Sequence, residues 1–139
     1  MKKLLIIVGT IVLLISNAYS DDIKHKRIEC SNKNSDDRFN NFFIVILGND
    51  KTAKVFKSNW TFNYTVDHYD IRTGINFISL ETSEAIHYEI NRINGRLWSK
   101  KERGIVGTCF KMEDGFNPEA FLKSIVEENI AKQKEKNIF

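Results

Sequence analysis

The 139-residue sequence contains a single proline, Pro118, and only two cysteines, Cys30 and Cys109. It has no glycine-rich phosphate loop, no His-Glu-x-x-His motif and no Gly-x-Ser-x-Gly sequence, so the short signatures of nucleotide binding, zinc peptidases and serine hydrolases are missing. Internal repeats and low-complexity linkers are also missing, which favours one domain. The lack of catalytic motifs favours a binding protein over an enzyme, and no cofactor is expected.

No apolar run reaches the roughly 20 residues that a membrane-spanning helix needs. The longest one, Leu4–Ile15, follows two lysines and precedes the small residues Ala18 and Ser20. This order of charge, apolar stretch and small-residue site predicts a signal peptide over residues 1–20, cleaved before Asp21. The mature chain is therefore expected to be periplasmic or secreted, with no stable membrane insertion.

The mature chain carries little net charge. The full sequence has 21 Lys and Arg against 18 Asp and Glu, and removal of Lys2 and Lys3 leaves 19 against 18, a net charge of +1. Proteins that bind nucleic acid usually present a clustered basic surface. No such cluster precedes the C-terminal tail, so a nucleic-acid partner is not expected.

The two cysteines both lie in the part of the chain that is predicted to be exported. In an oxidising compartment, such a pair usually forms a structural disulfide. Redox pairs are usually close in sequence, as in Cys-x-x-Cys, and two lone thiols make a poor metal site. We therefore predict that Cys30 and Cys109 tie an early strand to one of the last strands.

Short segments rich in β-branched and aromatic residues predict about seven antiparallel strands. The unbroken run Phe42–Leu47 is typical of a strand that is covered on both faces. Asn94-Gly95 predicts a tight hairpin turn, because this dipeptide tolerates positive φ angles. Seven predicted strands lie at 23–30, within 38–47, and at 59–66, 75–80, 86–91, 96–100 and 105–112, and the short segment 53–57 is a further candidate.

The pattern changes to a helical period after Gly115. Asn117 can cap a helix that has Pro118 in its first position. Residues about 118–134 are predicted to form an amphipathic helix, which packs on the sheet or, as an alternative, lies on a membrane surface through residues 118–136. The fold class is therefore mainly β (α+β): a single domain over 21–136, a small antiparallel β-barrel or curled sheet with one C-terminal helix, then a frayed tail at 137–139. The apolar stripe of the predicted helix consists of Phe121, Leu122, Ile125, Val126 and Ile130.

Residues 59–66 alternate strictly between two kinds of side chain, which predicts a half-buried strand. The aromatic and apolar face is expected to point inward, and it contains Trp60, Phe62, Tyr64 and Val66. The polar face either meets water or contacts a sugar or a partner's edge, and it contains Asn59, Thr61, Asn63 and Thr65.

The densest group of potential metal ligands is Asp67-His68-Tyr69-Asp70, which His87 and Glu89 could join from a neighbouring hairpin. Carboxylates and imidazoles bind zinc and act as acids and bases. A metal-assisted hydrolase using Asp67, His68, Asp70 and His87 is therefore the alternative function. The spacing matches no established metal motif, and the segment lies where a strand is expected to end.

Taken with the signal peptide, Cys30, the Ile90–Gly95 hairpin and the Gly107-Thr108-Cys109 segment resemble small exported one-disulfide β-proteins of proteobacteria. The resemblance implies an exported β domain. The leading hypothesis is a non-enzymatic binding module. Its partner would be a protein, such as a cell-envelope enzyme that it inhibits, a glycan, or a small apolar ligand held in a barrel mouth.

Overall fold

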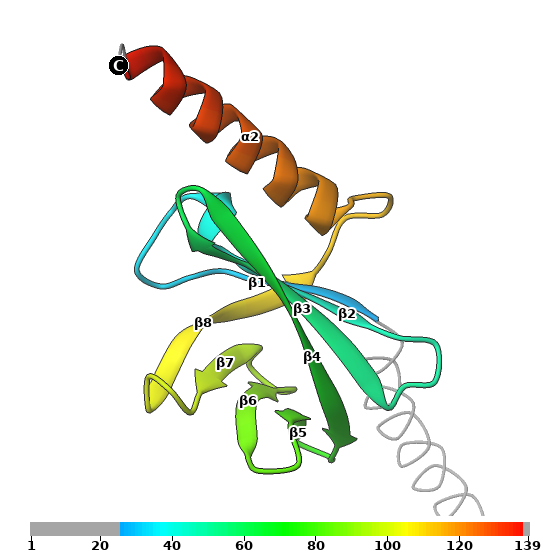
Figure 1. Cartoon of the computed structure of the whole chain (residues 1–139). Coiled ribbons are helices and arrows are strands. Elements are labelled where there is room, and N and C mark those ends of the chain that lie inside the picture. Colours follow the sequence, from blue (N-terminus) through cyan, green and yellow to red (C-terminus); the bar gives the residue numbers. More distant parts are fainter. Residues whose placement is uncertain (1–25, 138–139) are drawn as a thin grey trace, which may run out of the picture.

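The computed structural model describes residues 26–137, which form eight antiparallel strands and a long C-terminal helix (Figure 1). Each strand pairs with the next, and the last pairs with the first to close a barrel. The predicted class, a small antiparallel β-barrel with one C-terminal helix, is confirmed. The predicted signal peptide at 1–20, the beginning of the first predicted strand and residues 138–139 lie outside the described residues. The strands are β1 (Arg27–Cys30), β2 (Phe42–Ile46), β3 (Thr52–Trp60), β4 (Asn63–Thr73), β5 (Phe77–Glu81), β6 (Ile86–Asn91), β7 (Arg96–Ser99) and β8 (Gly104–Lys111).

Alternating side chains of β2 belong to two separate cores. The run Phe42–Leu47 predicted a strand that is covered on both faces in this way. Ile44 points into the barrel, whereas the fully buried Phe43 points outward. The inner core fills the barrel, and its most buried members are Cys30, Ile44, Val55, Leu80 and Leu97. The outer core lies between the barrel and the helix, and its buried members are Phe39, Phe43, Phe56, Met112, Leu122 and Val126. Both faces of β2 are therefore covered.

The helix α2 (Pro118–Lys136) begins as predicted, because the Asn117 side chain accepts a hydrogen bond from the backbone N–H of Ala120 at 3.1 Å. Its first half packs on the outside of the barrel over β3 and β4, where Leu122 and Val126 are buried. Its second half projects away from the barrel (Figure 1), and residues 131–137 are exposed. None of the helices within residues 26–137 is long and apolar enough to cross a membrane.

The closing seam of the barrel, between β1 and β8, carries the disulfide. Cys30 lies directly opposite Cys109 in the register of these two strands, and their sulfur atoms are bonded at 2.05 Å. The predicted disulfide is therefore confirmed, and it joins the first strand to the last.

The structure corrects the prediction of one continuous strand over 59–66. The chain reverses at Thr61 and Phe62, so that Trp60 at the end of β3 pairs with Asn63 at the start of β4. A two-residue reversal preserves the alternation of polar and apolar side chains. Since the turn contains no glycine, proline or asparagine, the sequence pattern passes through it without a break.

The expected inward aromatic face was consequently wrong as well. Tyr64 and Val66 lie outside the barrel and pack under α2, while Trp60 is 67% exposed at the turn. The segment containing Asp67 lies in the middle of β4 rather than at a strand end. Residues Arg38–Asn40 form a short 3₁₀ helix, η1, instead of a strand, because the Asp37 carboxylate accepts a hydrogen bond from the Phe39 N–H at 3.0 Å.

Candidate functional site

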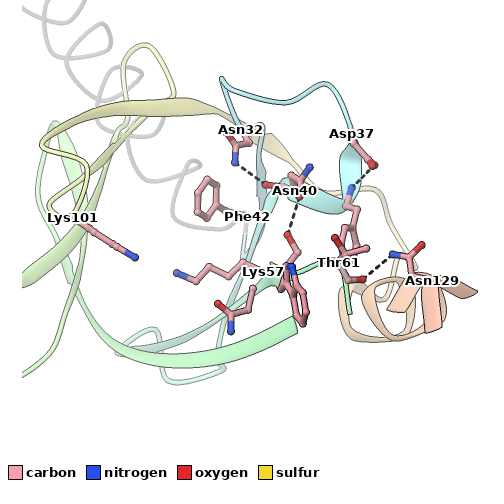
Figure 2. A pocket seen from close by; sticks show the side chains of 12 residues that line it. Asn32, Asp37, Asn40, Phe42, Lys57, Thr61, Lys101 and Asn129 are labelled. Carbon is pink, nitrogen blue, oxygen red and sulfur yellow. Dashed lines mark hydrogen bonds between the residues drawn. The ribbon is translucent and has the colours of Figure 1, made fainter. Parts of the chain in front are cut away.

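One end of the barrel opens into a cavity of about 680 Å³, which we call the mouth (Figure 2). It lies between the 31–41 loop, the β3–β4 hairpin, the loop after β7 and one side chain of α2. Half of its lining side chains are amides or hydroxyls, and three are aromatic. The residues that line it are Asn32, Asp37, Phe39, Asn40, Phe42, Lys57, Ser58, Asn59, Trp60, Thr61, Lys101 and Asn129.

The 31–41 loop is held against the mouth by hydrogen bonds among its own asparagines and to β3. The Asn32 amide donates to the carbonyl of Asn40 at 3.2 Å. The Asn40 side chain in turn donates to the Ser35 hydroxyl at 2.8 Å and accepts from the Ser58 hydroxyl at 3.1 Å. These contacts give this wall of the mouth a defined shape (Figure 2).

The β3–β4 hairpin forms a second wall, and α2 holds its tip. The Asn129 amide donates a hydrogen bond to the backbone carbonyl of Thr61 at 2.8 Å. Trp60 packs edge-on against Phe62, with ring centroids 5.1 Å apart, and leaves most of its surface to solvent. The tip therefore presents a fixed aromatic ring at the rim of the mouth.

The floor of the mouth is charged. The ammonium of Lys57 donates to the Tyr88 hydroxyl at 3.1 Å and lies 3.9 Å from the Asp67 carboxylate. Tyr69 packs edge-on against Tyr88, and its burial, followed by the nearby Tyr88 and Asp67, raises the pKa of Tyr69 to about 12. Lys57 is thus oriented from below while 29% of its side chain stays exposed to the mouth.

Thr65 lies beside this charged group. It pairs with Lys57 across β3 and β4, and paired residues project from the same face of a sheet. The Thr65 hydroxyl is buried and has no hydrogen-bond partner among the described residues. Thr65 itself does not line the mouth, so this hydroxyl lies in the barrel wall beneath Lys57.

Lys101 lies across the mouth from Lys57, on the loop between β7 and β8. Figure 2 shows the two side chains extending into the cavity from opposite sides. No carboxylate within residues 26–137 forms an ion pair with Lys101. Lys57, Lys101 and Asp37 are the charged residues of the lining, which gives a net charge of +2 − 1 = +1.

The predicted polar face is divided between the mouth and its surroundings. Asn59 and Thr61 line the mouth, and Thr65 lies beside Lys57. Asn63 is exposed at the start of β4 and does not line it. The lysines and the 31–41 loop were missed because no local motif marks them. The asparagines at 32, 34, 40 and 41 were the one available signal of a hydrogen-bonded loop.

The structure does not bring the predicted metal ligands together. Asp67 points toward the floor of the mouth, whereas His68 and Asp70 have the opposite parity on β4 and are exposed. His87 contacts the Thr82 hydroxyl at 2.8 Å and lies against Tyr69. Within the described part of the chain, no group of three or more His, Cys, Asp or Glu side chains could hold a metal ion.

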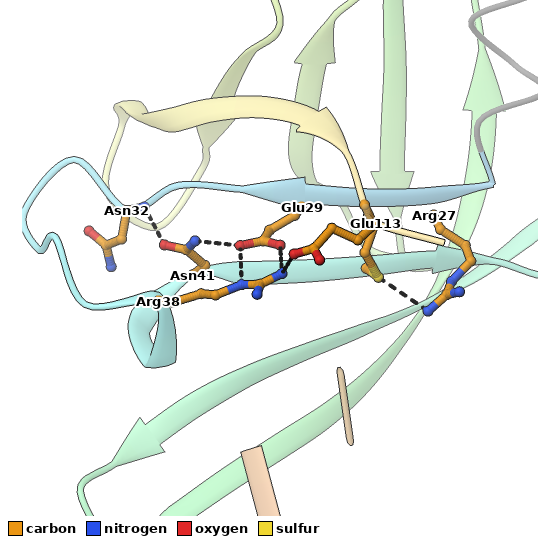
Figure 3. Close-up of polar contacts among 7 residues, drawn as sticks. Arg27, Glu29, Asn32, Arg38, Asn41 and Glu113 are labelled. Carbon is orange, nitrogen blue, oxygen red and sulfur yellow. Dashed lines mark hydrogen bonds and ion pairs between the residues drawn. The ribbon is translucent and has the colours of Figure 1, made fainter. Parts of the chain in front are cut away.

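An ion pair between the buried Glu29 and the partly exposed Arg38 anchors the base of the 31–41 loop on the outside of the barrel (Figure 3). The Glu29 carboxylate of β1 accepts hydrogen bonds from Arg38 and from the Asn41 amide. Arg38 also contacts Glu113 at 3.0 Å and lies 4.0 Å from the centre of the Phe116 ring. The hydrogen bond to Glu29 raises the pKa of Arg38, so the guanidinium stays charged at any physiological pH.

Comparisons of the chain with protein-family models, with curated proteins and with solved structures find no match. The functional assignment therefore depends on the geometry of the mouth and on the sequence.

Proposed function

We propose that this chain is an exported binding protein that holds a small polar ligand in the mouth of its barrel. The observation that carries the proposal is the cavity itself, whose volume of about 680 Å³ falls in the roughly 300–1,000 Å³ range of ligand sites. Its walls are held by hydrogen bonds from three separate parts of the chain. A site with prearranged walls loses little conformational entropy when a ligand binds.

The chemistry of the lining favours a polar ligand at the mouth over an apolar ligand inside the barrel. Packed side chains fill the barrel interior, where Leu80 and Leu97 are fully buried. The amide of Asn59 and the hydroxyl of Thr61 line the mouth, together with the aromatic rings of Phe42 and Trp60. Alternating amides and aromatic rings suit a saccharide, which has both hydroxyl edges and apolar faces.

Export is the second part of the proposal. It is supported by the charge, apolar run and small-residue site of residues 1–20, and the Cys30–Cys109 disulfide fits an oxidising compartment. The intact mass of protein recovered from the periplasm or medium tests it. The expected mass lacks residues 1–20 and rises by two hydrogen atoms on reduction. Retention of these residues would contradict the proposal.

A blocking variant tests ligand binding at the mouth. Mature protein is titrated calorimetrically with a panel of neutral and acidic di- and trisaccharides. Asn59→Trp should fill the mouth and weaken binding by at least about 10-fold, which is 1.4 kcal/mol of binding free energy. Asn63→Trp is the matched control, because Asn63 is exposed on the same hairpin but lies off the cavity. Equal binding by both variants, or no binding of any saccharide, would remove this function.

A further inference from the structure

Two lysines from opposite sides of the barrel extend into the mouth (Figure 2). We propose that they select an acidic saccharide, a sugar whose carboxylate binds between the ammonium groups of Lys57 and Lys101. This inference rests on the proposed function and names its ligand class. Like charges that face one cavity repel each other, so an anion placed between them is favoured by both.

The two lysines have different roles in this site. Lys57 is already oriented by the Tyr88 hydroxyl and lies 3.9 Å from Asp67, so part of its charge is balanced. It therefore provides a positioned hydrogen-bond donor at the floor. Lys101 has no ion-pair partner among the described residues and lies at the exposed rim, so it provides the uncompensated positive charge.

The acidic residue of the lining does not oppose this assignment. The Asp37 carboxylate caps η1 by accepting the Phe39 N–H, so it serves a backbone contact within the 31–41 loop. A ligand carboxylate in the mouth can accept hydrogen bonds from the ammonium groups of Lys57 and Lys101.

The remaining lining residues favour a sugar over a phosphorylated nucleotide as the carrier of the anion. Sites for phosphate commonly use arginine forks or glycine-rich backbone N–H groups. None of the described residues that line the mouth is an arginine or a glycine. Instead, Asn40, Ser58 and Asn59 lie beside the exposed ring of Trp60, which can stack against a sugar face.

The inference is tested by calorimetric titration with trigalacturonate, with its fully methyl-esterified form, which has the same sugar backbone and no charge, and with inorganic phosphate. We expect trigalacturonate to bind at least about 10-fold more tightly than the ester. Its affinity should fall as the salt concentration is raised. Lys101→Met should remove most of this difference and the salt dependence. Lys57→Met should weaken the binding of trigalacturonate by at least about 10-fold.

Two matched controls separate the mouth from general surface charge. Lys100→Met removes the neighbouring charge on the same loop but lies off the cavity, and Lys54→Met removes a lysine from the same strand as Lys57. Both should bind trigalacturonate like the unmodified protein. Circular dichroism and thermal melting of each variant confirm that it is folded.

The outcomes distinguish this inference from the proposed function. If the ester binds as tightly as the acid and Lys101→Met changes neither, the mouth binds sugars but the acidic class is wrong. If phosphate competes as well as trigalacturonate does, the site selects charge alone and the saccharide assignment fails. If neither saccharide nor any other member of the panel binds, both proposals are overturned.

Discussion

The buried carboxylate of Glu29 accepts two hydrogen bonds from the guanidinium of Arg38, one at 2.7 Å from Nη2 and one at 3.0 Å from Nε. Glu29 is 2% exposed, whereas Arg38 lies at the edge of the outer core and also meets Glu113. This pair connects β1 to the loop that forms one wall of the mouth. The shape of the mouth is therefore linked to the stability of the barrel wall.

Replacing Arg38 should cost much more stability than replacing its second partner. Arg38→Met leaves the buried Glu29 carboxylate with only the Asn41 amide as a partner, and such a loss typically destabilises by about 2–3 kcal/mol. Glu113→Gln removes a carboxylate whose side chain is 71% exposed, and the expected cost is below about 1 kcal/mol. Urea unfolding measures both values. Equal costs would show that the buried pair does not stabilise the fold.

Removing the disulfide should destabilise the barrel without changing its architecture. The bond closes a loop with a sequence separation of 79 residues, for which the chain-entropy model gives about 4.5 kcal/mol as an upper value. We expect the Cys30→Ala, Cys109→Ala double variant to unfold at a lower urea concentration than the oxidised protein. Unchanged stability would mean that the seam between β1 and β8 is held by its backbone pairing alone.

Gly107 is expected to tolerate no side chain. A Cβ atom there would overlap the carbonyl oxygen of Ser31, which is backbone and cannot rotate away. Backbone hydrogen bonds hold Ser31 to Thr108 at 2.9 Å and Lys33 to Val106 at 2.8 Å, so the segment cannot shift freely. Gly107→Ala should therefore destabilise by more than about 2 kcal/mol in urea unfolding.

The control for this prediction is Gly48→Ala. A Cβ atom at Gly48 meets nothing within 4 Å, so the change should stay within about 0.5 kcal/mol. Similar effects of the two substitutions would contradict the close approach of the 31–41 loop to β8.

Stability should fall steeply in strongly alkaline solution because of Tyr69. Its pKa is about 12 in the folded protein, whereas an unfolded tyrosine ionises near about 10. The unfolded chain thus loses this proton first, so the contribution of Tyr69 is complete below about pH 10 and is lost between about pH 10 and 12. Tyr69→Phe should flatten the decline and remove the late phase from the tyrosinate absorbance titration. A titration that keeps this phase in the variant would contradict the assignment.

Local signals in the sequence predicted the parts of the fold whose geometry is local. Asn117 and Pro118 mark the beginning of α2. Asn94-Gly95 correctly placed the hairpin between β6 and β7, although the loop spans residues 92–95 and Gly95, not Asn94, has a positive φ of 73°. The β3–β4 turn at Thr61 and Phe62 carries no such marker, so the alternation of its flanking strands hid it. The boundary between the third and fourth strands was therefore predicted near residue 58 instead of at this turn.

The mouth could be predicted only in part, because its residues come from distant segments. Asn59 and Thr61 belong to the polar face that the alternation indicated. Lys57 and Lys101 are 44 positions apart in the sequence (101 − 57), and only closure of the barrel brings both to one cavity. The predicted metal site was wrong for the opposite reason. His68 lies next to Asp67 in sequence but on the other face of β4.

The seam between β1 and β8 also sets the order in which the chain can fold. Since β1 pairs with β8, no shorter N-terminal portion of the chain can complete the barrel. Contacts between residues so far apart in sequence form slowly, because a long loop must close before they are made. For an exported chain, as proposed, this delay would be useful. The connectivity postpones closure until β8 has emerged, and the disulfide can only follow it.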